Sequence, residues 1–428
     1  MLLFWLSATL LVAQAALAFI VGYLLLLTTA AWRAARHTPP RPGDPTHHFA
    51  ILIPAHNEAL LLPETLASLD ALDYPRDLYE VHVVADNCTD QTAAVARKLG
   101  ATVHERQNPA ERGKGYALQW LLARIWQEPA GPAADAFVIV DADTVVAPGF
   151  LRVMDARLAG GERVIQGYYA VRDPGRGTAV SLRYAALAVL HFLRPQGRMV
   201  LGGSAGLKGN GMVFAAEVMQ AHRWPASITE DIELHMDLIL AGERVTFAPD
   251  ALVWAEMPDT LAEAQTQNER WERGRVELAR RYVPRLLHEA RGAAQQGRRG
   301  RAFLLFDAAL EHLIPPFSLL AALSGVGLLL AGLLAVPGRG RRKRACLPGV
   351  NLLLGVALLA GQAIYLLAGL RLVRAPRQVY QSLLAAPRYV LWKLLLYLGV
   401  LSGRGKDDWV RTARKEPLSQ SSLPWSDV

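Results

Sequence analysis

The sequence predicts an α/β domain held between membrane-spanning helices at both ends of the chain. Three observations indicate this fold class: long runs without charged residues near both termini, short apolar strands alternating with amphipathic helices between them, and polar turns after the strands. The chain has 428 residues, of which 52% are hydrophobic and 20% charged. This apolar excess excludes a disordered chain. The two cysteines, Cys88 and Cys346, are too few for a disulfide-stapled secreted fold.

The first 32 residues contain no Asp, Glu, Lys or Arg, and a membrane-spanning helix needs only about 20 apolar residues. A cleaved signal peptide would begin with basic residues and carry a shorter apolar core. We therefore expect residues 1–32 to form a transmembrane helix. The basic residues that follow it, Arg33, Arg36 and Arg41, place its C-terminal end in the cytoplasm. Residues 33–48, rich in proline and charge, are expected to be a linker.

Two further charge-free runs, residues 313–338 and 345–370, are long enough to cross a membrane. An odd number of helices places the basic segment 339–344 between them outside the cytoplasm, against the positive-inside tendency. Two explanations stay open. In the first, residues 303–320 form an additional crossing or a re-entrant segment, which changes the number of crossings. In the second, the short loop between the two apolar helices inserts regardless of its charge.

The remaining C-terminal segments are expected to lie at the membrane surface. Residues 284–312 are assigned to interfacial or linker helices. Residues 371–428 are assigned to an interfacial helix and a cytoplasmic tail. The helix is expected at Tyr389–Leu401, because that short apolar run mixes aromatic residues with a lysine.

Residues 49–283 form the predicted α/β domain, since apolar strands and amphipathic helices alternate there. In open sheets of this type ligands bind at the carboxyl ends of the strands, so the turns after the strands are the candidate sites. The strands are predicted at 49–53, 81–85, 102–104 and 137–140, and the helices at 59–71, 91–99, 116–127 and 148–159.

Acidic residues follow two of these strands. Asp86 directly follows the second strand, where a carboxylate can accept hydrogen bonds from a nucleobase or ribose, whereas Asp90 is explained by helix capping alone. Asp141 and Asp143 follow the fourth strand. Two neighbouring carboxylates are costly to bury unless a cation compensates them. Oxygen ligands at this spacing suit Mg²⁺ or Mn²⁺ holding a diphosphate.

Three further motifs are candidates for substrate binding. Lys114 lies in a glycine-flanked turn that opens a helix, which suits either a phosphate contact or a solvated loop, and the segment does not match the P-loop pattern. Glu230 and Asp231 precede a predicted helix at 232–241, where acids also satisfy free amide groups. Helical spacing places Gln267, Arg270 and Trp271 on one face, which suits a phosphate and a sugar ring or ordinary packing.

The order and spacing of these motifs resemble the membrane-bound family-2 glycosyltransferases, the group that contains cellulose, chitin and hyaluronan synthases and the nodulation chitooligosaccharide synthase. The resemblance covers residues 49–275. It rests on six motifs: Pro54-Ala-His-Asn-Glu58, Ala85-Asp-Asn-Cys-Thr-Asp90, Gly113-Lys-Gly115, Asp141-Ala-Asp143, Thr229-Glu-Asp231 and Gln267-x-x-Arg270-Trp271.

The resemblance implies a GT-A (Rossmann-like) domain that binds a nucleoside diphosphate sugar, expected to be a UDP sugar. In this reading Asp231 is the general base, and Glu230 is a candidate substrate-binding residue. A free aspartate is a weak base, so desolvation or nearby acids, with Glu230 and Glu233 as candidates, are needed to raise the pKa of Asp231. The other implied roles are uridine contact for Asp86, nucleotide contact for Asp141, Mg²⁺ or Mn²⁺ ligation for Asp143, phosphate contact for Lys114, and binding of the diphosphate and acceptor sugar for Gln267, Arg270 and Trp271.

A single in-line displacement needs one base and inverts the anomeric centre, so an α-linked donor yields a β-linkage. The glycine-rich segment 201–211 lacks the cysteine pattern of cellulose and hyaluronan synthases, and few spans are available to enclose a polymer. We therefore expect transfer to a glycolipid or a short glycan. A processive polysaccharide synthase, a non-catalytic membrane scaffold and a nucleotidyltransferase stay open as alternatives.

The expected location is the inner (plasma) membrane, as a multi-pass protein with a cytoplasmic catalytic domain. The basic excess gathers near the membrane segments, at 339–344 and 371–377, where attraction to anionic lipid explains it. We expect a lipid or glycan acceptor as partner and no nucleic acid.

Overall fold

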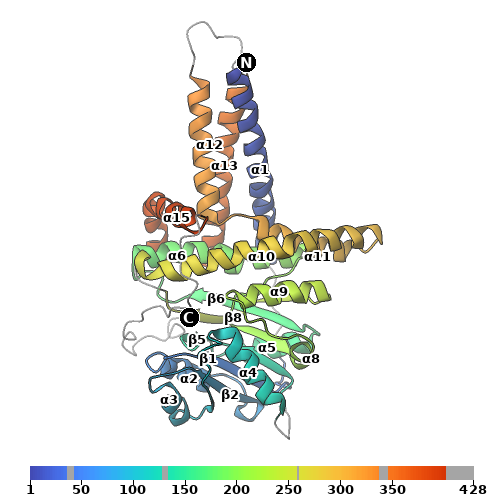
Figure 1. Cartoon of the computed structure of the whole chain (residues 1–428), viewed down its shortest axis with the longest axis vertical. Coiled ribbons are helices and arrows are strands. Elements are labelled where there is room, and N and C mark those ends of the chain that lie inside the picture. The colour runs from blue at the N-terminus through green and yellow to red at the C-terminus, as the bar shows by residue number, and fades with distance from the viewer. Residues whose placement is uncertain (36–42, 128–133, 258–259, 337–345, 402–428) are drawn as a thin grey trace.

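The computed structural model describes residues 1–35, 43–127, 134–257, 260–336 and 346–401. Figure 1 shows three layers: a bundle of long helices, a set of helices that cross beneath it, and an α/β domain on the far side of these helices. This arrangement confirms the predicted fold class. Arg36, Arg41, the basic segment 339–344 and the C-terminal tail 402–428 lie outside the described residues.

Within the described residues the α/β domain contains one eight-stranded sheet in the order β3-β2-β1-β4-β7-β6-β8-β5. Four strands run parallel at one side, and the antiparallel pairing of β4 with β7 begins the other side. The strands are β1 (Phe49–Ala55), β2 (Tyr79–Asp86), β3 (Thr102–Arg106), β4 (Ala136–Ile139), β5 (Thr144–Val146), β6 (Val164–Val171), β7 (Met212–Ala215) and β8 (Val245–Ala255).

The parallel strands are apolar on both faces because helices cover both sides of the sheet. Along β1, Ile51 and Ile53 pack into one core with Leu66 of α2, whereas Leu52 packs into the other core with Leu121 of α4. Continuous apolar runs therefore identified these four strands from sequence. The strands of the antiparallel side were missed, and β8 carries solvent-exposed polar positions such as Asp250.

The helices of the α/β domain begin close to their predicted positions. α2 begins at Leu62 rather than at residue 59, because Pro63 is tolerated only in the first helical turn. α4 begins at Lys114, two residues before the expected start. The helices are α2 (Leu62–Asp70), η1 (Arg76–Leu78), α3 (Thr92–Lys98), α4 (Lys114–Gln127), α5 (Phe150–Ala159), α6 (Thr178–Ala188), η2 (Val189–Leu193), α7 (Arg194–Leu201), α8 (Ala216–Ala221) and α9 (Glu230–Ala241).

Beneath the bundle, α10 (Leu261–Gln295) and α11 (Arg299–Leu313) lie side by side across the α/β domain (Figure 1). α10 passes through residue 283, where we expected the domain to end, and it contains Pro284. α11 packs on α10 and α9 through a buried cluster that includes Leu286 and Leu305. Residues 303–313 therefore belong to this layer and do not add a crossing to the bundle.

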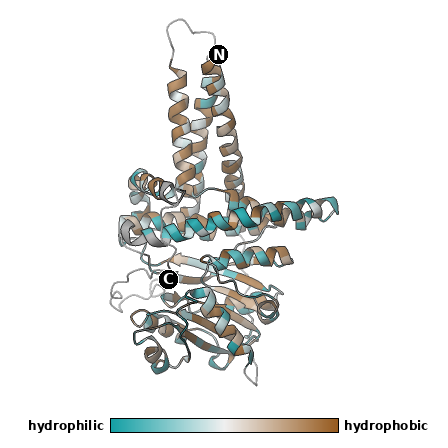
Figure 2. Ribbon diagram, viewed as in Figure 1, coloured by the Kyte–Doolittle hydropathy of each residue, from teal (hydrophilic) through white to brown (hydrophobic). Residues whose placement is uncertain are grey.

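The bundle is formed by α1 (Leu2–Ala34), α12 (Phe317–Ala335) and α13 (Cys346–Leu372). In the described residues three helices are long and apolar enough to cross a membrane: Leu2–Ala34, Phe317–Ala335 and Leu347–Leu372. In Figure 2 the ribbons of these helices are coloured predominantly as hydrophobic residues. The second span begins at Phe317 rather than at residue 313, because Pro315 and Pro316 interrupt the helix before it.

The C-terminal helices α14 (Arg377–Ser382), η3 (Leu383–Ala385) and α15 (Ala386–Leu401) follow the bundle. α15 lies across the base of the bundle in Figure 1, close to α10 and α12. α1 packs closely against Gly197 of α7. A Cβ added to this glycine would lie 2.4 Å from the carbonyl oxygen of Leu27 of α1. The α/β domain and the bundle are thus in direct contact.

Candidate active site

The predicted site residues gather at the carboxyl edge of the parallel strands. β2, β1 and β4 are neighbours in the sheet, so the turns that follow them meet there. Asp86, Asp141 and Asp143 come from two of these turns, and His56 from the third. All four residues line one cavity of ≈ 1090 Å³.

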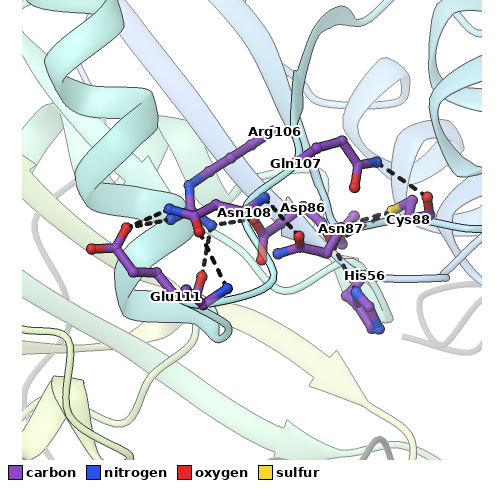
Figure 3. A network of polar contacts seen from close by, with 10 residues as sticks. His56, Asp86, Asn87, Cys88, Arg106, Gln107, Asn108 and Glu111 are labelled. Carbon is purple, nitrogen blue, oxygen red and sulfur yellow. Dashed lines mark hydrogen bonds and ion pairs between the residues drawn. The ribbon is translucent and has the colours of Figure 1, made fainter.

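Asp86 is held by a network of ion pairs shown in Figure 3. Its Oδ1 accepts a hydrogen bond from Nη1 of Arg106 at 2.7 Å, and Nη2 of Arg106 pairs with Oε2 of Glu111 at 2.9 Å. The parallel register places Arg106 of β3 beside Asp86 of β2. The sequence analysis missed Arg106, although its position one strand away from Asp86 is a signal that could have identified it.

The turn after β2 is fixed to the turns beside it. Asn87 has a left-handed φ of 51°, and its Oδ1 accepts a hydrogen bond from the amide of Asn108 at 2.8 Å. The ring of His56 contacts the carbonyl oxygen of Asp86 at 2.7 Å, and the amide of Thr89 donates to Asn57 at 2.7 Å. These contacts hold the Asp86 carboxylate at the wall of the cavity before any ligand binds.

Asp90 has the local role that its position predicts. Its Oδ1 accepts a hydrogen bond from the amide of Thr92, the first residue of α3, at 3.0 Å. Its Oδ2 accepts from the amide of Ala59 at 3.2 Å. The carboxylate therefore stabilises the start of α3 and the neighbouring turn.

Lys114 brings two of the predicted motifs together. Its ammonium group donates to Oδ1 of Asp141 and to the carbonyl oxygen of Gly209. Burial opposes the charge of Lys114, but Asp141, Glu230 and Asp231 act more strongly together and raise its pKa. A single cation therefore lies between the carboxylates of the β4 turn and those of α9.

Glu230 and Asp231 occupy the first turn of α9, as the acidic motif predicts. Burial raises the pKa of both carboxyl groups, Asp231 adds to the effect on Glu230, and Lys114 opposes it at both. The pair therefore holds a proton more readily than exposed carboxylates do. Gly274 of α10 packs on this turn, since an added Cβ would lie 2.6 Å from the side chain of Thr229.

That close approach brings Arg270 and Trp271 of α10 into the cavity wall, whereas the side chain of Gln267 lies outside the described part of the structure. Trp271 is 37% exposed, and the guanidinium carbon of Arg183 lies 5.9 Å from the centre of its ring. Burial lowers the pKa of Arg270, and Glu230 opposes this shift. An aromatic face and a cation thus face the cavity together, the pair that suits a sugar ring and a phosphate.

The cavity continues from the sheet to the long apolar helices. Its lining includes Asp231, Phe317 and Leu320 of α12, and Tyr365 of α13. Tyr389 of α15 also lines it. This continuity was not predictable from the sequence, because it depends on how α10, α12, α13 and α15 converge.

Buried ion pairs form the wall between the α/β domain and the bundle. Nη2 of Arg198 lies 2.7 Å from Oδ2 of Asp307, and Nη2 of Arg194 lies 2.9 Å from Oε2 of Glu311. The hydroxyl of Tyr23, on α1, donates to Oδ1 of Asp307. Burial acts against the charge of Glu311, but Arg194 and Arg198 lower its pKa to about 2. Segments far apart in the sequence are joined here, so local motifs gave no signal.

The family model described as "Glycosyltransferase like family 2" matches residues 45–274. Among curated relatives, a beta-monoglucosyldiacylglycerol synthase from Synechocystis is 29% identical over 268 residues, covering 58% of this chain and 54% of that protein. A poly-beta-1,6-N-acetyl-D-glucosamine synthase from Staphylococcus aureus is 26% identical over 276 residues, covering 61% and 62%. This chain spans about half the length of the first curated relatives it matches.

Among solved structures, a mannosyltransferase from Pyrobaculum calidifontis, in complex with GDP-Man and Mn²⁺, is similar in fold. Its TM-score is 0.50 at 21% identity, and the match covers 85% of this chain and 97% of that one. At this identity the match supports the fold alone.

Proposed function

This chain belongs to glycosyltransferase family 2, whose model matches more than half of its residues, and on this premise we propose that it transfers a sugar from a UDP sugar to a glycolipid or a short glycan at a membrane. The observation that carries the proposal is the single cavity that joins Asp86, Asp143 and Asp231 to the bases of α12 and α13. A donor bound at the sheet and an acceptor entering from the membrane would meet at Asp231.

In this proposal the donor lies along the carboxyl edge of the sheet. Asp86, held by Arg106, accepts hydrogen bonds from the uridine. Lys114 leaves its pairing with Asp141 in part to contact the diphosphate, and Arg270 approaches the same group from α10. Charge-assisted contacts of this kind favour the departing diphosphate over the bound sugar nucleotide as negative charge grows on it.

Asp231 is the proposed general base. The acceptor hydroxyl oxygen attacks the anomeric carbon, its proton passes to the Asp231 carboxylate, and the bond from the anomeric carbon to UDP breaks with its electron pair on the phosphate. Such a displacement inverts the anomeric centre and forms a β-linkage from an α-linked donor. The raised pKa of Asp231 brings the base closer to neutral pH, where proton transfer is most effective.

Asp143 is the proposed ligand of Mg²⁺ or Mn²⁺, with Asp141 beside it. Both carboxylates line the cavity, and Mg²⁺ in phosphate-transfer sites commonly uses one or two carboxylates together with substrate phosphates. In the described ranges no group of three or more His, Cys, Asp or Glu side chains forms an all-protein metal site. The cation would neutralise the leaving diphosphate as a Lewis acid.

We also propose that the catalytic domain faces the cytoplasm. Arg33 at the end of α1 and Arg371 at the end of α13 lie on the side of the bundle that meets the α/β domain. α1 begins at Leu2 at the opposite end, and this residue is exposed, so a membrane-impermeant maleimide should label a Leu2→Cys variant that also carries Cys88→Ser and Cys346→Ser in right-side-out vesicles. Labelling only in inside-out vesicles would reverse the proposed orientation.

The decisive experiment is UDP release by purified protein with Mg²⁺ or Mn²⁺, across a panel of UDP sugars, with and without membrane lipid extract. Release with one sugar that rises on adding lipid is the expected result. Release of UDP without lipid, together with a growing polymer, would contradict the proposed acceptor and indicate a processive synthase. Absence of release with every sugar and acceptor would favour a non-catalytic scaffold.

A further inference from the structure

Lys208 lies on the cavity wall between the catalytic turn and the membrane end. It belongs to the loop between α7 and β7, whose residues Gly206 to Gly209 line the cavity. The charges that act on its ammonium group include Asp231 of α9, Glu311 of α11, and Arg194 and Arg198 of α7. Lys208 is therefore a cavity-lining cation within the electrostatic reach of both Asp231 and the buried ion pairs of α7 and α11.

The loop that carries Lys208 is fixed by its backbone. The amide of Lys208 donates to Oε1 of the fully buried Gln166 at 2.8 Å. Gly206 has a φ of +82°, and an added Cβ there would lie 3.5 Å from Nζ of Lys208. Gly209 has a φ of +80°, and an added Cβ there would lie 3.3 Å from Oδ2 of Asp231. The two glycines therefore let the loop approach both functional side chains closely.

The ammonium group of Lys208 has no ion-pair or hydrogen-bond partner within the described ranges, and its side chain is partly exposed to the cavity. The neighbouring cations Arg194 and Arg198 are already paired with Glu311 and Asp307. Burial lowers the pKa of Lys208 to about 8; Arg194 and Arg198 add to this shift, and Glu311 and Asp231 oppose it. An anion bound at this point would pair with the Lys208 ammonium group.

The neighbouring histidines, His235 and His312, do not add positive charge beside Lys208. Burial lowers the pKa of His312 to about 4 and holds the pKa of His235 well below its ordinary value, so both rings are neutral near pH 7. Neutral rings can donate hydrogen bonds to an oxyanion without adding charge. Among the described residues that line the cavity, Lys208 thus carries a positive charge without an ion-pair partner.

The cavity also has apolar walls on the side of the bundle. They include Phe317 and Leu320 of α12, Leu366 of α13 and Leu24 of α1. All four residues belong to helices that are long and apolar enough to cross a membrane. An acyl or isoprenoid chain entering between these helices would stay in an apolar environment until it reached the lysine.

We propose that the acceptor is a lipid whose headgroup hydroxyl is joined through a phosphate to its apolar chain, and that Lys208 binds this phosphate. The inference rests on the proposed transfer function and names its acceptor class. Asp231, Lys208 and apolar side chains of α1, α12 and α13 all line the same cavity, and the loop at Gly206 and Gly209 lies close to both Lys208 and Asp231. A lipid with a hydroxyl, a phosphate and an apolar chain offers one group to each of these three. The hydroxyl reacts as described above, and the phosphate is unchanged.

The first test compares acceptors in micelles of a polyoxyethylene detergent, with the UDP sugar that the release panel identifies. The acceptors are phosphatidylglycerol, a polyprenyl-diphosphate-linked N-acetylglucosamine and neutral diacylglycerol. The first two separate the phospholipid and polyprenyl sources of the phosphate, and diacylglycerol offers a hydroxyl without one. The wild type should prefer one of the phosphate-bearing acceptors.

Lys208→Met should raise the KM for that acceptor by about 10–100-fold, the loss expected for a hydrogen bond to a charged group, while kcat changes less. Transfer to diacylglycerol should be unchanged, and Lys208→Arg should retain most of the affinity. Lys98→Met, at an exposed position on α3, is the matched control. Equal use of diacylglycerol by the wild type, or an equal loss with all acceptors in Lys208→Met, would overturn the inference.

A second test measures binding without turnover, by native mass spectrometry of delipidated protein with phosphatidylglycerol, the polyprenyl-linked sugar and diacylglycerol. The wild type should retain a phosphate-bearing lipid that Lys208→Met loses and Lys98→Met keeps. Lys208-dependent binding without nucleotide release would overturn the transfer function and leave the lipid site standing. Identical lipid retention by the wild type and Lys208→Met would overturn the site even if transfer is observed.

Discussion

The two ends of the cavity contain ion pairs of similar chemistry in different surroundings. At the donor end the side chains of Lys114 and Asp141 are 21% and 33% exposed, whereas at the membrane end those of Arg198 and Asp307 are 1% and 0% exposed. An exposed pair can exchange partners with a ligand, but a fully buried pair cannot separate without leaving an uncompensated charge. The Lys114–Asp141 pair at the donor end can therefore open to bind a ligand. The Arg198–Asp307 pair at the membrane end instead holds α1, α7 and α11 together.

The largest expected effect is at Asp231, where the two ends meet. Asp231→Asn should lower the rate of sugar transfer by about 10²–10⁴-fold, because a positioned base contributes about that much to a reaction. UDP binding should remain, since the amide has nearly the same shape. Transfer and UDP affinity are measured together on the purified protein.

Asp250→Asn, on the exposed surface of β8, provides the control for Asp231→Asn. Transfer at a near wild-type rate in the Asp231 variant would show that another residue is the base. Asp231 would then not be the residue at which the two ends of the cavity act together.

The next effect concerns stability at the membrane end. Asp307→Ala should destabilise the protein by about 3–5 kcal/mol, because Arg198 would keep a buried charge without its partner. Thermal unfolding in detergent measures the change. The matched variant Asp73→Ala breaks a surface pair with Arg152 and should cost about 0–1 kcal/mol. Similar losses in both variants would show that burial does not distinguish the two kinds of pair.

Removal of a donor-end carboxylate should affect binding rather than stability. Asp143→Ala should weaken Mg²⁺- or Mn²⁺-dependent UDP binding by at least about tenfold, the loss that even an outer-shell partner of a metal can cause. Calorimetry with and without the cation measures it, and the melting temperature should hardly change. Unchanged metal dependence in the Asp143→Ala variant would show that other residues bind the cation.

The smallest expected effect is a shift in pH dependence. In the proposed mechanism the unprotonated form of Asp231 is the base, so the rate should rise with pH through a pKa above that of an ordinary aspartate. Glu230→Gln removes a neighbouring acid that titrates together with Asp231, and the acid limb of the profile should move to lower pH. The pH–rate profiles of the wild type and the variant test this expectation. An acid limb at the same pH in both proteins would show that the two carboxylates titrate independently.

The donor end was largely predictable, because its residues follow strands that form a continuous apolar pattern. Asp86, Asp141 and Asp143 follow β2 and β4, and the structure places all three on one cavity as expected. Their partners were less accessible to prediction. Arg106 reaches Asp86 only through the register of β3 on β2, and Lys114 reaches Asp141 across the sheet edge from α4.

The membrane end was not predictable, since its contacts join residues far apart in the chain. Tyr23 and Asp307 belong to helices separated by most of the sequence, and α11 looked like part of a span or a linker. Lys208 was visible only as one polar residue in a glycine-rich segment. Its position between Asp231 and Glu311 results from the packing of that loop against α9 and α11.

The sequence by itself determined the fold class, the three apolar helices and the motifs of the donor site, because periodicity, charge-free length and strand-end residues are local properties of a chain. Only the tertiary structure decided that the donor site and the base of the bundle share one cavity, and which charges in it remain unpaired. Those features depend on the relative placement of α10, α11 and the bundle, and packing between distant segments leaves no local pattern in the sequence.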